Sequence, residues 1–294
     1  MKILIIKTGA QGDVLRTTAL LHLFKNDLVY WLTKENALPL LENNPCIKYV
    51  IAYNNKNILL GIDFDLILSL DDDEELCKFV TDIKTKKLTG AYYDYKENRR
   101  TYTEESSSWF DMSVISKFGI ERANVLKKQN KLSCQEHLFR MLGKHFNKEP
   151  YIFNINPINF PKVIVGIETR SGKVWPMKQW SKYEELAVLL KRDGYEVKFF
   201  EERPTLKQYI DDINNCGLII TGDTLAMHIG LALNKEVIAL FGPTPAEEIF
   251  SYNRMKKIKA KTDCYCCYRR DTENKENCID SISVGEVYEA AREI

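Results

Sequence analysis

Short apolar runs alternate along the chain with segments in which apolar residues recur every three or four positions. In the first half, five apolar runs predict strands, at residues 2–6, 27–32, 47–52, 65–70 and 86–93. Helices are predicted between and after them, at residues 13–25 and 35–42, from 71–76 onward, and at 106–118, where Gly119 should end the helix. This alternation is typical of a parallel sheet covered by helices.

The alternation stops around residues 147–162, "NKEPYIFNINPINFPK", which hold three prolines and four asparagines without a sustained period. Such a stretch is typical of a connection between domains. The pattern then resumes with strands predicted at 162–168, 195–201, 217–221 and 236–242, and helices at 179–192, 205–215, 223–233 and 284–293. We therefore predict an α/β protein with two Rossmann-like domains, residues 1–155 and 156–294, facing a central cleft.

The composition argues against nucleic-acid-binding, membrane-spanning and secreted proteins. The 294 residues are 45% hydrophobic and 28% charged, and 42 basic against 41 acidic residues leave no global charge for nucleic-acid binding. No apolar run approaches the ~20 residues of a membrane span. The opening run of residues 3–6 lacks the length and cleavage site of a signal peptide, so we expect a cytoplasmic protein, which is compatible with work at a membrane surface.

The first candidate site is "KTGAQGD", after the first predicted strand. Gly9 and Gly12 permit a tight turn and close approach of a ligand to backbone N–H groups. A nicotinamide-binding fingerprint would need a third glycine where Val14 stands. Asp13 is either a helix N-cap or a general base, whose pKa a helix N-terminus would lower. A weak base suits a reaction such as glycosyl transfer, in which the proton leaves late.

The second candidate site is "ETRSGKVWPMKQW", a loop after a strand of the second half. It is either a solvated basic loop before a helix that Pro176 helps to start, or a site for an anionic leaving group. In the second case Lys173 would face a diphosphate, assisted by Arg170 or Ser171. A catalytic metal would then be unnecessary, because fixed cations can neutralise the departing charge.

The third candidate site is "GDTLAMHIGLAL", where Asp223 and Thr224 follow a buried strand and open a helix. The first free amides of that helix, from Thr224 to Ala226, can bind a phosphate. Asp223 is alternatively a simple helix cap. His228, one turn further, is more often a hydrogen-bonded core histidine than a catalyst.

Four of the eight cysteines crowd one segment, Cys264, Cys266, Cys267 and Cys278. Four thiolates are enough to hold zinc or iron in a structural site. Neighbouring cysteines seldom both bind one metal, so free or partly disulfide-bonded thiols are the alternative. The other four lie singly in or beside apolar segments, as reduced core thiols do: Cys46, Cys77, Cys134 and Cys216.

Four segments, in this order, resemble the heptosyltransferases, GT-B glycosyltransferases that build the inner core of lipopolysaccharide: "ILIIKTGAQGD", "KVWPMKQW", "GDTLAMHIGLAL" with "VIALFGPT", and "CYCCYRRD…CIDSISVGEVYEA". The resemblance implies an inverting transfer of heptose from ADP-heptose without a catalytic metal. It matches Asp13 to the base, Lys173 to the phosphate-contacting lysine, and Asp223 with Thr224 to the donor-binding segment. Many relatives have glycine where this chain has Leu225, which makes close backbone approach to the donor less assured.

The local residue patterns and the resemblance together indicate the expected site residues. Asp13 and Lys173 are expected to be catalytic. Glu201 or Glu202, at the end of a predicted strand, could accept hydrogen bonds from a ribose, or both are solvated loop residues. We expect these residues to bind the donor: Thr8, Gly9, Gly12, Arg170, Ser171, Lys173, Glu201, Asp223, Thr224, Leu225, Ala226 and His228. Lys96, Arg99 and Arg100 form a basic loop, either an ordinary solvated face or a binding site for an anionic acceptor.

The leading hypothesis is an ADP-heptose-dependent glycosyltransferase acting on a lipopolysaccharide-core glycolipid or a protein acceptor. A GT-B enzyme using another nucleotide sugar is the first alternative. The second is a catalytically silent sugar-nucleotide-binding protein, which would have no need for a base such as Asp13.

Overall fold

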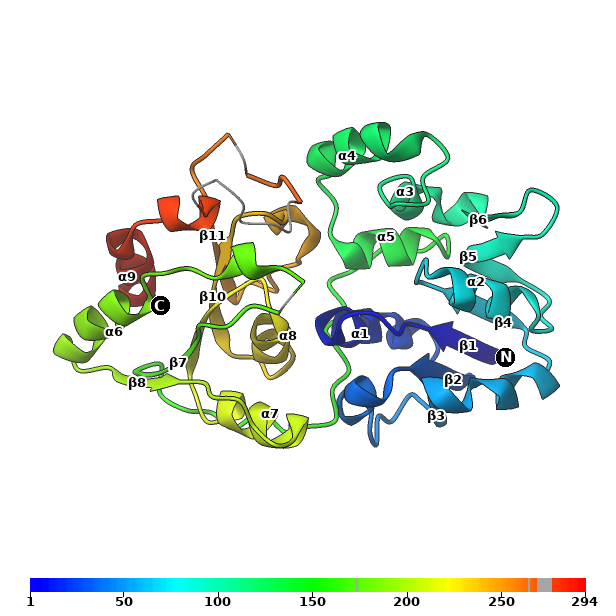
Figure 1. The fold of residues 1–294 in the computed structure, drawn as a ribbon. Helices are drawn as coiled ribbons and strands as arrows, with labels where there is room; N and C mark the ends of the chain where they lie inside the picture. The colour runs from blue at the N-terminus through cyan, green and yellow to red at the C-terminus, as the bar shows by residue number, and fades with distance from the viewer. Residues whose placement is uncertain (173, 264, 269–276) are drawn as a thin grey trace. The chain divides into compact units, whose positions relative to one another are not determined.

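The computed structural model describes residues 1–172, 174–263, 265–268 and 277–294. The chain divides into two compact units, Met1–Asn154 (unit 1) and Ile155–Ile294 (unit 2), each built on its own sheet (Figure 1). The predicted α/β class is therefore confirmed. Among the described residues, no helix combines the length and apolar character that crossing a bilayer requires.

Unit 1 has a six-stranded sheet in the order β3-β2-β1-β4-β5-β6. The strands are β1 Lys2–Ile6, β2 Leu28–Thr33, β3 Tyr49–Ala52, β4 Leu66–Ser69, β5 Leu88–Asp94 and β6 Arg99–Tyr102. All neighbours pair in parallel except β5 and β6, which form an antiparallel hairpin. The predicted basic loop is thus wrong for Arg99 and Arg100, which lie on a strand. The alternation in "RRTY" is too short, and starts with too many charges, to be read as a strand.

The α-helices of unit 1 are α1 Gln11–Thr17, α2 Glu74–Thr81, α3 Ser107–Phe110, α4 Gly119–Gln129 and α5 Cys134–Arg140. Four 3₁₀ helices accompany them, Thr18–Leu23, Glu35–Leu40, Tyr53–Gly61 and Glu104–Ser106. Pro39 lies inside the second of these, where an α-helix was predicted.

The prediction of a single helix at residues 106–118 is wrong. Helix α3 ends at Phe110, and Gly119 begins α4 instead of ending a helix. Ser113 and Ser116 explain the break. Their hydroxyl oxygens accept hydrogen bonds from the backbone N–H groups two residues on, at 3.2 Å in each case. Such local bonds offer the backbone an alternative to the helix.

Unit 2 has a five-stranded parallel sheet in the order β11-β10-β9-β7-β8. The strands are β7 Ile164–Glu168, β8 Glu196–Phe199, β9 Leu218–Gly222, β10 Glu236–Phe241 and β11 Met255–Lys259. The helices are α6 Tyr183–Arg192, α7 Leu206–Asn214, α8 Leu225–Ala232 and α9 Val284–Arg292, with 3₁₀ helices Pro176–Lys178, Ala246–Glu248 and Cys278–Ser281. Strand β11 was not predicted, because it is a charged edge strand, "MKKIK".

Helices α6 and α9 bury their apolar stripes together against one face of the unit 2 sheet. Leu186 and Leu190 of α6 and Val287 of α9 belong to the same core cluster as alternate residues of the strands, such as Ile220 and Ile238. Helix α8 packs against β9 and β10. Packing of these helices on the sheet holds in place the turns that follow the strands, and the candidate residues lie in those turns.

Gly166, on the central strand β7, leaves no room for a side chain. A Cβ atom there would lie 2.2 Å from Cζ of Phe200 and 2.9 Å from Sγ of Cys216. We predict that Gly166→Ala lowers the free energy of unfolding by about 1–3 kcal/mol, because the core must shift to accept the methyl group. Urea unfolding measures this difference.

Gly285→Ala is the matched control in the same unit. A Cβ atom at Gly285 meets no heavy atom within 4 Å, and the residue lies in the first turn of α9. Stability should stay unchanged or rise by up to about 1 kcal/mol. Equal losses in the two variants would contradict the packing described for Gly166.

Candidate functional site

In each unit the candidate residues follow the carboxyl ends of central strands, which is where parallel sheets usually bind ligands. In unit 1 these are the segments after the neighbouring strands β1 and β4. In unit 2 they are the segments after β7, β9 and β10, also neighbours in one sheet.

Asp71, just after β4, anchors the segment after β1. Its carboxylate lies 2.6 Å from Nζ of Lys7 and accepts hydrogen bonds from both the backbone N–H and the hydroxyl of Thr8. A Cβ atom at Gly9 would lie only 3.2 Å from Oδ1 of Asp71, so glycine suits this close approach. Donor binding by Thr8 stays a prediction, and the structure adds a role for Thr8 inside the loop.

Lys7 is charged although its side chain is largely shielded from solvent. Burial lowers the pKa of Lys7, but the negative charges of Asp71 and Asp13 outweigh that effect and leave the pKa above its usual value. An ammonium group therefore stands close to both carboxylates, and Asp71 was not singled out from the sequence as its partner.

Asp13 is the third residue of α1 and not its cap. Ala10 occupies the N-cap position and makes no side-chain cap hydrogen bond. Oδ1 of Asp13 lies 2.9 Å from Nη2 of Arg16, one turn further along the helix; the Asp13 side chain is 32% exposed and that of Arg16 only 9%. The carboxylate is thus oriented by a buried guanidinium while remaining open to solvent.

Arg16 is a site residue that the sequence reasoning missed, although its spacing of three residues from Asp13 within a helix was a usable signal. Its guanidinium carbon lies 5.9 Å from the ring centre of Trp109. Burial raises the pKa of the neighbouring Tyr151 hydroxyl, with the charge of Arg16 acting in the opposite sense. Asp13 thus lies near two cations, Lys7 and Arg16, and near the neutral Tyr151.

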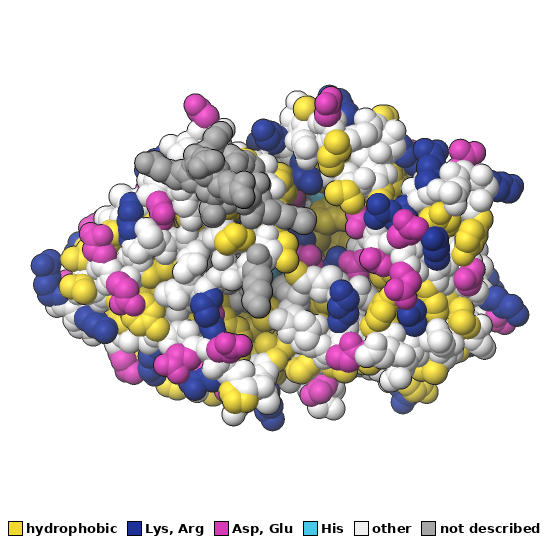
Figure 2. All heavy atoms as spheres, in the orientation of Figure 1, with side chains coloured by type: hydrophobic (Ala, Val, Ile, Leu, Met, Phe, Trp, Pro, Cys, Tyr) yellow, Lys and Arg dark blue, Asp and Glu magenta, His cyan; other side chains and the backbone are white. Residues whose placement is uncertain are grey.

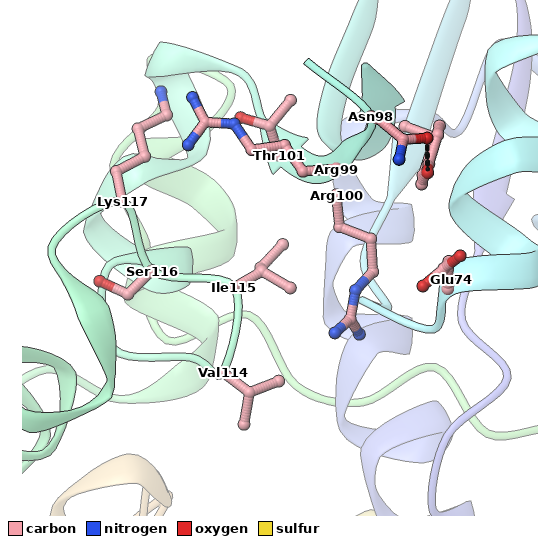
Figure 3. Close-up of a pocket in the computed structure, with 10 residues that line it drawn as sticks. Glu74, Asn98, Arg99, Arg100, Thr101, Val114, Ile115, Ser116 and Lys117 are labelled. Carbon is pink, nitrogen blue, oxygen red and sulfur yellow. Dashed lines mark hydrogen bonds between the residues drawn. The ribbon is translucent and has the colours of Figure 1, made fainter. Parts of the chain in front are cut away.

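Unit 1 also contains a cavity of about 340 Å³, lined by Arg99, Arg100 and Lys117 among others (Figure 3). Nη1 of Arg100 donates a hydrogen bond to the carbonyl oxygen of Asp72 at 2.7 Å. Figure 3 shows the side chain of Arg100 extending between Ile115 and Glu74. Two of the three predicted acceptor-binding residues are therefore brought to one cavity.

Lys96, the third, is not among the described residues that line this cavity. Its backbone N–H donates to Oδ1 of Asp94 at 2.9 Å, in the turn of the β5–β6 hairpin.

In unit 2, Asp223 forms an ion pair after β9 that is largely shielded from solvent. Its Oδ2 lies 2.5 Å from Nζ of Lys178 and accepts a hydrogen bond from the hydroxyl of Thr244 at 2.8 Å. Burial alone would raise the pKa of Asp223, but the charge and hydrogen bond of Lys178, with help from His228 and Thr244, lower it to about 2. Asp223 is therefore an ionised anchor between three segments and not a simple helix cap.

Lys178 was missed by the sequence reasoning, although it lies inside the quoted segment "KVWPMKQW". Its Nζ also donates to the carbonyl oxygen of Asp223 at 3.1 Å and lies 5.3 Å from the ring centre of Trp175. Lys173, expected to face the leaving group, lies outside the described residues.

The N-cap of α8 is Thr224, whose hydroxyl oxygen lies 2.8 Å from that of Thr221. The helix therefore begins at Leu225, two residues later than predicted, and the amides of Leu225 and Ala226 lie in its first turn. His228 is buried, with 4% of its surface exposed, and its charge contributes to the low pKa of Asp223. Contact of Thr224, Leu225, Ala226 and His228 with the donor stays a prediction.

Arg170, after β7, is held by Glu168. Nε and Nη2 of Arg170 each donate a hydrogen bond of 2.8 Å to the Glu168 carboxylate, which also accepts one from the Tyr209 hydroxyl. The Glu168 side chain is 4% exposed and that of Arg170 40%. Glu168 and Tyr209 were missed from the sequence, and they leave Arg170 oriented with part of its surface in solvent.

The remaining predicted donor residues lie near these elements. Ser171 donates a hydrogen bond to the carbonyl oxygen of Pro176 at 3.4 Å, and Glu201 and Glu202 are exposed beyond the end of β8. Gly12 is buried in the first turn of α1.

The cysteine cluster is described in part. Cys266 and Cys278 are buried, Cys267 is half-buried, and all three are free of disulfides, whereas Cys264 lies outside the described residues. Within the described part of the chain, no group of three or more His, Cys, Asp or Glu side chains could hold a metal. The four-thiolate site that includes Cys264 stays a prediction. Cys77, Cys134 and Cys216 are buried reduced thiols, as predicted, whereas Cys46 is only half-buried.

The Asp223 pair should make stability depend on pH. A carboxyl group that titrates at 3.8 when unfolded and at about 2 when folded contributes about 2 kcal/mol to the free energy of unfolding at neutral pH. Because the folded pKa is the lower one, this contribution is present above about pH 4 and is lost as the pH falls towards 2.

We therefore predict that Asp223→Asn destabilises the protein at pH 6, and that the difference from the wild type shrinks by about 2 kcal/mol as the pH falls through that window. Urea unfolding at several pH values measures the difference. The same substitution at the exposed Asp63 controls for the loss of one carboxylate. A difference that stays constant from pH 6 to pH 2 would contradict the ion pair.

Comparisons with known proteins agree with this architecture. Residues 201–279, which contain the Asp223 segment, match the sequence model of Glycosyltransferase family 9 (heptosyltransferase). Lipooligosaccharide heptosyltransferase 2 of Haemophilus influenzae is 30% identical over 128 residues, a match that spans 34% of this chain and 36% of the relative. The matching part is therefore about a third of that relative's length.

Two solved structures share the fold over nearly the whole chain. A family 9 glycosyl transferase from Veillonella parvula superimposes with a TM-score of 0.72 at 16% identity, covering 99% of this chain and 96% of that one. The Escherichia coli heptosyltransferase WaaC with ADP-2-deoxy-2-fluoro heptose gives 0.65 at 15% identity, covering 100% and 99%. The predicted GT-B fold class and the resemblance to the heptosyltransferases are thereby confirmed.

Proposed function

We propose that this protein is an inverting glycosyltransferase that moves heptose from ADP-heptose to a hydroxyl group of a lipopolysaccharide-core glycan or a related glycan or protein acceptor. The match of residues 201–279 to the heptosyltransferase model carries the proposal. The similar fold of WaaC, whose structure holds an ADP-heptose analogue, supports the choice of nucleotide and sugar.

In this proposal unit 2 binds the nucleotide sugar. The amides of Leu225 and Ala226 and the side chain of Thr224 meet the diphosphate at the start of α8, since a helix N-terminus favours an anion. Asp223, fixed by Lys178, holds that helix start in place and does not itself meet the phosphates. Arg170, oriented by Glu168, and Lys173 supply positive charge to the leaving ADP.

Unit 1 binds the acceptor. Arg99 and Arg100 offer guanidinium groups at the cavity that would suit a phosphate or carboxylate on the acceptor, and Lys96 adds charge nearby. The reaction would take place at the inner face of the cytoplasmic membrane, where a glycolipid acceptor is available.

Asp13 is the proposed general base. The acceptor oxygen forms a bond to the anomeric carbon while the bond from that carbon to the diphosphate breaks, and the acceptor proton passes to Asp13. The electron pair leaves with ADP, whose charge fixed cations neutralise, so the step needs no metal. The partial exposure of Asp13 and its ion pair with Arg16 support this role, because the carboxylate is reachable and is oriented by a cation.

Asp13→Asn tests the base. We predict a fall in kcat of about 10²–10⁴-fold, since proton transfer to a positioned side chain contributes that much, with the Kd for ADP-heptose nearly unchanged. Transfer is measured by ADP release and donor binding by calorimetry. Glu42→Gln, at an exposed position, is the matched control. Full turnover in Asp13→Asn would refute the assigned role.

The donor is tested by protection from thermal unfolding. At a concentration about 100 times its Kd, ADP-heptose should raise the unfolding temperature by roughly 5 °C, because it binds only the folded protein. ADP-glucose and UDP-sugars are the comparison ligands. Protection by UDP-sugars alone would contradict the ADP-heptose proposal and favour a GT-B enzyme with another donor.

A further inference from the structure

Helix α4 and the loop before it expose apolar side chains to an unusual degree. Val114 is 62% exposed, Phe118 63%, Ile120 51% and Val125 42%. Of the eleven residues of α4, Ala123 alone is buried. Phe118, the N-cap residue of α4, and Val125 are seven positions apart, two turns of helix, so both lie away from Ala123, whereas Ile120 lies nearer the side of Ala123. Exposed apolar groups gathered in this way are typical of an interaction surface.

Basic side chains surround these apolar ones. Residues 114–131 contain five basic residues and one acidic residue, although the whole chain has a net charge of only +1. The basic residues are Lys117, Arg122, Lys127, Lys128 and Lys131. Among the described residues, none forms an ion pair with Arg122, Lys128 or Lys131. Figure 2 shows hydrophobic and basic side chains together over the part of unit 1 that α4 occupies.

We propose that this surface, residues 114–131, binds the face of a membrane that carries anionic lipids. Phe118 and Val125 would enter the boundary between headgroups and acyl chains, and the lysines and Arg122 would meet lipid phosphates. Buried apolar side chains and the attraction of basic side chains to anionic lipids are the two contributions that hold a protein at a membrane surface.

The charges favour a lipid surface over a protein partner. The cores of protein interfaces are depleted of lysine, whereas here lysines border the apolar residues closely. Binding to single-stranded nucleic acid would use stacked aromatic rings, and the exposed apolar residues here are mostly aliphatic.

The surface continues into the cavity of unit 1, since Val114 and Lys117 also line it beside Arg99 and Arg100 (Figure 3). A lipid-linked acceptor would then reach the cavity from the membrane. The binding of membranes is nevertheless independent of the proposed transfer reaction, because it is measured without donor or acceptor.

Flotation of the full-length protein with lipid vesicles tests the inference. The protein should float with vesicles of phosphatidylcholine and phosphatidylglycerol, and at least about tenfold less with phosphatidylcholine alone, because each basic side chain gains from the negative surface. High salt should release it, since screening weakens these contacts. Equal flotation with both kinds of vesicle, or none with either, would overturn the proposal.

Variants locate the surface. Phe118→Ser with Val125→Ser removes apolar contacts, and Arg122→Glu with Lys128→Glu reverses charges; each pair should reduce flotation at least about tenfold. Val188→Ser with Lys207→Glu, at exposed positions of α6 and α7, is the matched control and should float as the wild type does. Circular dichroism checks that each variant unfolds at the wild-type temperature.

Two results would contradict this assignment. One is unchanged flotation in both α4 variants. The other is self-association of the wild type without lipid that the Phe118 and Val125 substitutions abolish, which would assign the surface to a second copy of the chain.

Discussion

Carboxylate–lysine pairs that are largely shielded from solvent fix the segments that follow interior strands of both units. In unit 1, Asp71 binds Lys7 and Thr8 and holds the turn after β1. In unit 2, Asp223 binds Lys178 and Thr244 and holds the start of α8. Removing charges from water is costly, and removal of one partner leaves the other charge buried and uncompensated. Each pair therefore keeps its segment in one conformation.

In both units, an exposed charged side chain is paired with a more deeply buried side chain of opposite charge. Asp13 is backed by the more deeply buried Arg16, and Arg170 by the more deeply buried Glu168. In both cases the buried partner orients the exposed one, so the candidate reactive or binding group does not have to be ordered when a ligand arrives. Such preorganisation favours catalysis and binding by groups that are already in position.

Features that depend on the local pattern of residues could be predicted from the sequence. The buried strands, their division between two α/β units and the segments after β1, β7 and β9 follow from periodicity and from glycine or proline signals. The partners Asp71, Lys178 and Tyr209 do not. The contacts from Lys7 to Asp71, from Lys178 to Asp223 and from Tyr209 to Glu168 join residues 64, 45 and 41 positions apart. Strands β6 and β11 were missed because charged edge strands lack apolar alternation.

The central claim is that a glycosyl group passes from a nucleotide sugar to an acceptor hydroxyl with Asp13 receiving the proton. Mass spectrometry of a reaction containing the protein, ADP-heptose and a lipopolysaccharide inner-core acceptor tests it most directly. The account predicts an acceptor heavier by one heptose residue and one ADP released for each transfer. Release of ADP without a change in acceptor mass, or heptose transfer that Asp13→Ala leaves at the wild-type rate, would contradict it.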